Sequence, residues 1–157
     1  MPRKVTKILV RPKLPDRKYN NEMVQRVINR VMQNGKKQVA ERLVYEGMDS
    51  AGKRLKKEPL EVIEKAIKNI TPYMETRSRR VGGANYQIPF EVKGQRQKHL
   101  TVMWFVQAAR SKKGMPMSER IATELVDAYN QTGVAFKKKE DTHKMAESNR
   151  AFAHFAR

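Results

Sequence analysis

The sequence contains no cysteine and no long apolar run, and its acidic residues are far fewer than its basic ones. The lack of cysteine excludes disulfides, thiolate catalysis and zinc-ribbon sites, and it fits a reducing compartment. No apolar run approaches the roughly 18 residues that a membrane-spanning helix needs. The N-terminus reads Met1-Pro2-Arg3-Lys4 and has no apolar signal core with a small-residue cleavage site. We therefore expect a cytoplasmic protein that does not enter a membrane.

Catalytic and cofactor motifs are also missing. No Walker-type phosphate loop is present, and the adjacent glycines Gly82-Gly83 are not a dinucleotide fingerprint. The histidines are His99, His143 and His154, and none stands four residues from another, as a helical metal-binding pair would. The sequence thus offers no reason to propose an enzyme, a cofactor or a metal site.

Positive charge is what the sequence has in excess. Lysine and arginine number 34 against 16 aspartate and glutamate, which gives a formal net charge of +18. A compact chain with so much like charge repels itself, and a polyanion relieves that repulsion through salt-sensitive contacts. The excess is uneven, because residues 1–20 carry a net charge of +6 and residues 73–113 a net charge of +7. We interpret these two segments as parts of a binding surface.

Apolar residues recur at helical spacing and predict a bundle of about six helices. The first helix is expected to be capped by Asn20 and ended by Asn34-Gly35. The next four run from about Lys36 to Ala51, Pro59 to Pro72, Arg96 to Lys112 and Met117 to Tyr129, and a sixth occupies much of Ala135 to Ala153. The second helix is expected to bury Val39, Ala40, Leu43, Val44 and Met48, with Gly52 in the loop that follows. The methionines and Trp104 are expected in the core rather than at a ligand site.

Between the third and fourth helices the pattern is that of a β-hairpin. Tyr73–Val81 and Ala84–Phe90 are the expected strands, and Gly82-Gly83 is the two-residue turn. This turn sets the register: Arg79 lies opposite Tyr86 and Arg77 opposite Ile88 on one face, with Arg80 opposite Asn85 and Ser78 opposite Gln87 on the other. Arginine forks onto phosphates and stacks on bases, so the composition suits a nucleic-acid-binding finger. An ordinary solvated hairpin is the alternative.

Two further basic segments lie near the ends of the chain. Residues 1–18 are an expected flexible arm, and residues 19–157 a single helical domain with the hairpin inserted at about 73–90. The arm, interrupted by three prolines, either orders on nucleic acid or only solubilises the chain. Near the other end, Lys137-Lys138-Lys139 precede Glu140-Asp141, which suits either a solvated helix face or a contact surface.

Two long motifs make the sequence more specific. Residues 75–89 read ETRSRRVGGANYQIP and residues 137–154 read KKKEDTHKMAESNRAFAH. Both closely resemble the small-subunit ribosomal protein seven family, in its hairpin and its closing helix. Shorter matches at 14–16, 35–40, 59–72 and 117–128 extend the resemblance over almost the whole chain. It implies a mainly α fold with six helices and a protruding two-stranded β-hairpin, in agreement with the pattern of the residues.

The resemblance also implies a function. Members of this family are structural components of the small ribosomal subunit that bind the 3′ major domain of 16S rRNA and help nucleate assembly of the subunit head. They lie near the exit-site tRNA and the mRNA exit path, beside small-subunit ribosomal proteins nine and eleven. The implied RNA contacts are Arg3, Lys4, Lys36, Lys37, Arg77, Arg79, Arg80, Lys93 and Arg96, with Lys137, Lys138 and Arg150 in second rank. The implied tRNA- and mRNA-proximal tip is Arg79, Arg80, Val81, Gly82 and Gly83.

The sequence departs from the family pattern at three places, and two other functions stay open. Arg17 stands where proline is frequent, Met103 stands where a basic residue is usual, and residues 155–157 replace the commoner aromatic-arginine-tryptophan ending. Arg17 predicts a less rigid exit of the arm, Met103 argues against an RNA contact of the fourth helix there, and contacts of the last three residues are not carried over. The alternative function is a DNA-architectural protein with a basic β-hairpin, for which Val81 is the one apolar wedge near the tip. An RNA-modifying enzyme would need a catalytic constellation that the sequence does not show.

Overall fold

The computed structural model of this chain describes residues 14–156. It is mainly helical with one two-stranded hairpin, which confirms the predicted fold class. In chain order the elements are α1 (Glu22–Val31), α2 (Lys37–Leu55), α3 (Pro59–Ile70), β1 (Met74–Val81), β2 (Ala84–Glu91), α4 (Gly94–Ser111), α5 (Met117–Tyr129), α6 (Gly133–Ser148) and the 3-10 helix η1 (Arg150–Ala156). Most of the predicted arm, with Arg3 and Lys4, lies outside the described residues, so the division into arm and domain stays a prediction. No helix within 14–156 is both long and apolar enough to cross a membrane.

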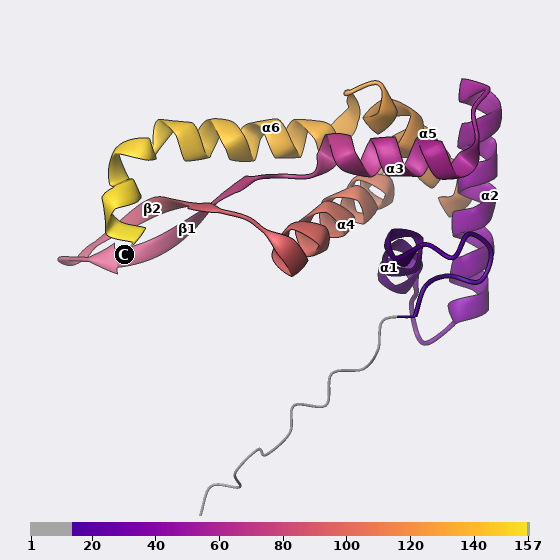
Figure 1. The fold of residues 1–157 in the computed structure, drawn as a ribbon, viewed down its shortest axis with the longest axis horizontal. Helices are drawn as coiled ribbons and strands as arrows, with labels where there is room; N and C mark the ends of the chain where they lie inside the picture. Colours follow the sequence, from indigo (N-terminus) through magenta and orange to yellow (C-terminus); the bar gives the residue numbers. More distant parts are fainter. Residues whose placement is uncertain (1–13, 157) are drawn as a thin grey trace, which may run out of the picture.

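The helices pack around α5, and the hairpin projects away from them (Figure 1). α5 contacts α2, α3, α4 and α6, and its bounds are those predicted. The largest fully buried side chains include Phe105 of α4, Ile28 of α1 and Leu125 of α5. α6 runs alongside the hairpin and contacts both strands, so the finger has one long helix as its support.

α1 has different ends from those predicted. Its N-cap is Asn21, whose side chain accepts two backbone N–H groups of the first turn at 2.8 and 3.4 Å. Asn20 cannot serve, because its backbone is left-handed with φ of 50°. The helix ends at Val31, before the predicted stop at 34–35. There Arg110 of α4 donates to two of its last carbonyls at 3.1 and 3.4 Å, which satisfies groups that a helix end leaves open.

α2 continues past the predicted end to Leu55, and two of its glycines let it approach its neighbours closely. A β-carbon on Gly47 would lie 2.8 Å from a side-chain carbon of Ile121 in α5. One on Gly52 would lie 2.9 Å from the carbonyl oxygen of Lys57. Gly52 is therefore a helical residue under the tight turn into α3, and its predicted place in a loop is wrong.

Core predictions hold for most apolar residues, with exceptions at the surface. Ala40, Val44, Met48 and Trp104 are buried as predicted, and Leu43 is partly buried. Val39 was predicted to be buried but is 44% exposed, because the buried stripe of α2 starts one residue later. Met115 and Met145 are also exposed, so not every methionine is a core residue.

The hairpin has the predicted register. Arg79 pairs with Tyr86, Arg77 with Ile88, Arg80 with Asn85 and Ser78 with Gln87. Gly82 and Gly83 have φ of 57° and 91°, which glycine adopts without strain in a two-residue turn. Ile88 is fully buried, so the inner part of the finger belongs to the core.

The predicted last helix is confirmed over most of its expected range and ends at Ser148. α6 stops there, the chain turns at Asn149, and η1 folds back over β2. The Tyr86 ring then lies 5.1 Å from the Phe152 ring and 5.4 Å from the Phe155 ring, between centroids. We attribute the end of α6 to these ring contacts, because a helix continued to residue 153 would lead Phe152 away from the Tyr86 ring of the hairpin.

Lys112, which follows α4, forms an ion pair with a buried carboxylate of α5. This ion pair can be used to test how α4 and α5 are held together. Glu124 of α5 is fully buried, its Oε2 lies 3.1 Å from Lys112 Nζ, and its Oε1 accepts the Ala135 N–H at 3.0 Å. We predict that Lys112→Ala lowers the free energy of unfolding by about 3 kcal/mol, because a buried charge loses its partner. Urea unfolding followed by circular dichroism measures the change. The exposed neighbour Lys113 serves as the control, and Lys113→Ala should change the free energy of unfolding by less than about 0.5 kcal/mol. Equal losses of stability in the two variants would contradict the role of Lys112.

Candidate nucleic-acid interface

Glu75 of β1 joins the hairpin to α4. Its carboxylate is 6% exposed; Oε2 accepts from Arg96 Nε and Nη2 at 3.1 and 3.0 Å, and Oε1 accepts from Arg77 Nε at 2.6 Å. Burial would raise the pKa of this carboxyl group, but the hydrogen bonds from Arg96 and Arg77 hold its pKa below the ordinary value. One buried anion thus fixes two predicted RNA-binding arginines beside each other, with about half of each side chain exposed.

Arg79 is held by the C-terminal segment. Its Nη1 donates to the carbonyl oxygen of Phe155 at 2.9 Å, across 76 residues of sequence. Its cross-strand partner Tyr86 packs on Phe152 and Phe155. The arginine near the tip therefore has a set position rather than a freely moving side chain.

The tip itself is open. The Arg80 residue is exposed, and its side chain makes no hydrogen bond or ion pair with the residues that the structure describes. A β-carbon on Gly82 or Gly83 would meet nothing within 4 Å. Val81 is half-buried. The tip therefore presents one unpaired guanidinium group beside bare backbone.

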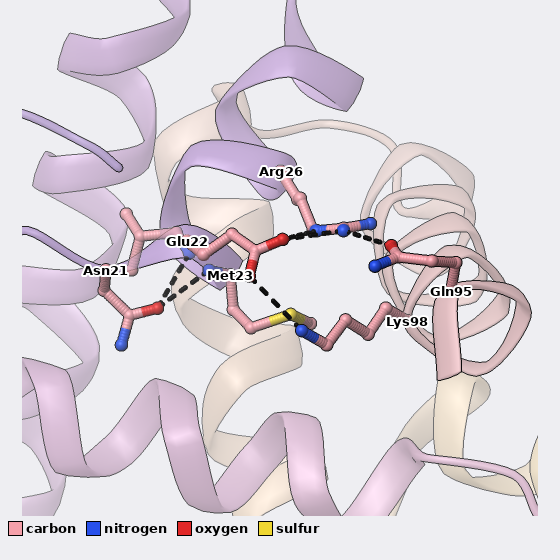
Figure 2. A network of polar contacts seen from close by, with 7 residues as sticks. Asn21, Glu22, Met23, Arg26, Gln95 and Lys98 are labelled. Carbon is pink, nitrogen blue, oxygen red and sulfur yellow. Dashed lines mark hydrogen bonds and ion pairs between the residues drawn. The ribbon is translucent and has the colours of Figure 1, made fainter. Parts of the chain in front are cut away.

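Sequence reasoning missed a second basic area, between α1 and α4 (Figure 2). Glu22 accepts from Arg26 at 2.7 Å and from Lys98 of α4 at 3.2 Å, and Arg26 also donates to Gln95 at 2.5 Å. Hydrogen bonds from Arg26 and Lys98 lower the pKa of Glu22. A hollow of about 220 Å³ beside this network is lined by Arg26, Asn29, Arg30, Lys98, His99, Val102 and Met103, without a carboxylate.

A sequence signal for this α1–α4 hollow did exist. Arg26 and Arg30 are four residues apart, on the side of α1 that faces away from its apolar stripe. Arg96 and Lys98 both lie near the start of α4, but two residues apart and so on different sides of the helix: Arg96 binds Glu75 of the hairpin and Lys98 binds Glu22 of α1. Met103, where the family usually has a basic residue, is one of the lining residues. Two groups of cations therefore flank the start of α4, one at the hairpin and one at α1.

Within the described residues, no hydrogen bond or ion pair links the other predicted contacts to the cations at the hairpin and at α1. Three of these residues are exposed: Lys36 in the α1–α2 turn, and Lys137 and Lys138 on α6. The other three form ion pairs: Lys37 with Glu41 at 3.7 Å, Lys93 with Glu91, and Arg150 with Glu147 at 3.3 Å. In Figure 1, α6 lies above the hairpin and α4, whereas α1 lies to the right of α4 at a similar height. Lys139 is not on a solvated face, because its Nζ donates to the Asn69 carbonyl of α3 at 2.6 Å.

Comparison with known proteins decides the family. A family model described as ribosomal protein S7p/S5e matches residues 2–150. The chain belongs to this family. Proteins named small ribosomal subunit protein uS7 are 53% identical in Chloroflexus aurantiacus over 94% of both chains, 54% in Thermosipho africanus over 93% of this chain and 94% of the relative, and 56% in Symbiobacterium thermophilum over 90% of both. The family predicted from the two long motifs is confirmed, and the chain is a ribosomal protein.

In this ribosomal protein, Glu75 gives a pH-dependent prediction. Glu75→Gln is expected to lower the free energy of unfolding by about 2 kcal/mol at pH 7, because two arginines lose a charged acceptor. The pKa of Glu75 is lowered on folding, so its contribution is fully present above the unfolded pKa. The difference between wild type and variant should therefore shrink as the pH falls below about 4.5.

Chemical unfolding at a series of pH values measures this difference. Glu91→Gln is the matched control, because Glu91 stands at the end of the partner strand and its carboxylate is exposed. It should leave the stability at pH 7 unchanged. A loss for Glu75→Gln that stays constant down to pH 3 would argue against the carboxylate as its cause.

Proposed function

We propose that this protein is a structural component of the cytoplasmic small ribosomal subunit and binds the 3′ major domain of 16S rRNA. The observation that carries the proposal is the set of cations on the hairpin and on both sides of the start of α4, where Glu22 and Glu75 each bind two cations. The names of the relatives support the same subunit. Phosphate contacts provide affinity, and the shape and unpaired bases of the RNA provide recognition.

The proposed contacts keep the predicted residues and add those that the structure revealed. Arg80 offers a free guanidinium group at the tip, while Arg77 and Arg96 act as a fixed pair. The full set is Arg3, Lys4, Lys36, Lys37, Arg77, Arg79, Arg80, Lys93 and Arg96, with Lys137, Lys138 and Arg150 in second rank, extended by Arg26, Arg30 and Lys98.

The projecting finger supports a finer placement. It projects beyond the helical body, so a tip of Arg79, Arg80, Val81, Gly82 and Gly83 extends beyond an RNA site on the body (Figure 1). We assign this tip to the neighbourhood of the exit-site tRNA and the mRNA exit path, and the protein to nucleation of the subunit head beside small-subunit ribosomal proteins nine and eleven. Family membership favours this assignment over the alternative of a DNA-architectural protein.

RNA binding tests the proposal. The purified protein should bind a transcript of the 16S 3′ major domain in preference to duplex DNA. An Arg79→Ala/Arg80→Ala variant should bind less tightly, with a log–log salt slope smaller by roughly 1.5, if each arginine releases about 0.7–0.9 counterions. Filter binding over a range of salt concentrations measures both quantities.

The control is an Arg42→Ala/Lys53→Ala variant, which removes equal charge from exposed positions of α2 outside the proposed surface. It should bind like the wild type. Equal binding of transcript and duplex DNA would overturn RNA specificity and favour the DNA-architectural alternative. Equal losses in both double variants would show that only net charge matters.

A further inference from the structure

A second hollow lies beyond the last turn of α1. It has a volume of about 380 Å³ and is bounded by α1, the α1–α2 turn, α2, α4 and α5. This volume is within the roughly 300–1,000 Å³ of sites that hold small ligands. Met32, Val39, Leu43 and Met117 give it apolar walls, and Val39 is the 44% exposed side chain that the core does not use.

Three cations border these apolar walls: Lys36, Arg110 and Arg120. Arg110 donates to the last carbonyls of α1, and Arg120 Nε donates to the Met115 carbonyl at 2.7 Å. These bonds hold both guanidinium groups in place and leave each with further N–H donors. Because no carboxylate lines the hollow, its charge is complementary to an anion.

Two amide side chains also line the hollow, those of Gln33 and Asn34. Neither side chain makes a hydrogen bond within the described part of the chain, and both are exposed. Side-chain amides pair with the edges of unstacked bases. Apolar walls, free amides and fixed cations together match the three parts of a nucleotide: a flat ring, a polar ring edge and a phosphate.

The hollow lies next to the proposed RNA surface, and a hydrogen bond links residues of the two. Arg30 lines the α1–α4 hollow, and its carbonyl accepts the hydrogen bond from Arg110, which lines this second hollow. A strand of RNA that lies on α1 and α4 therefore passes the end of α1 directly beside it.

We infer that this hollow receives a single unpaired nucleotide of the bound RNA. The base lies against Val39 and Met117, its edge meets Gln33 and Asn34, and its phosphate meets the cations. The inference rests on the proposed function and deepens it, because it names a site where the protein reads a base rather than a phosphate chain.

A substitution that fills the hollow tests this inference. Val39→Trp places a large side chain at the exposed wall without removing a charge. It should weaken binding to the 16S 3′ major domain transcript about tenfold with an unchanged salt slope. In chemical probing of RNA 2′-hydroxyl groups, an unpaired nucleotide that the wild type protects should become reactive. Gln38→Trp, at the exposed neighbouring position, is the control and should behave like the wild type.

Gln33→Ala provides a second variant that leaves packing untouched, and it should weaken binding and expose the same nucleotide. Thermal unfolding confirms that each variant is folded. If the wild type does not bind the transcript, the proposed function itself fails. If the wild type binds and the arginine variant is weaker, while Val39→Trp and Gln33→Ala bind and protect like the wild type, the nucleotide site is overturned and the RNA assignment stands.

Discussion

Repulsion between like charges is the constraint on which this architecture depends. With 34 basic and 16 acidic residues, the fold must place its few carboxylates where each contributes most. Several stand at contacts between elements: Glu75 joins the hairpin to α4, Glu22 joins α1 to α4, and Glu119 joins α5 to Arg54 of α2. Each one attracts two elements to each other and reduces repulsion at their contact. The remaining cations then lie on outer surfaces, where RNA phosphates are their natural counter-ions.

Much of the fold was predictable because local rules decide it. The Gly82-Gly83 turn dictated the hairpin register, and apolar spacing dictated α5 to the residue. The errors come from tertiary contacts that a single sequence does not display. α1 ends early where a side chain from α4 binds its carbonyls, and the last helix breaks where aromatic rings of η1 cover the hairpin.

The candidate site was likewise predictable from the sequence only in part. Residue type and family resemblance identify the hairpin arginines, but not that a buried glutamate orders two of them or that a terminal carbonyl holds a third. The hollows between helices were not predictable, because their walls come from elements far apart in sequence. Arg26 and Arg30 carried a readable signal, a basic pair one helical turn apart, whose significance depends on how α4 crosses α1.

The fold-back of η1 also has a consequence for the order of synthesis. Arg79 is bonded to a carbonyl 76 residues later in the chain, and its neighbour Tyr86 is covered by rings from the same late segment. Until η1 is made, the outer part of the finger lacks this cover, and a two-stranded hairpin is only marginally stable in water by itself. The position of the Arg79 side chain is therefore set only after η1 has been made and has folded back over β2.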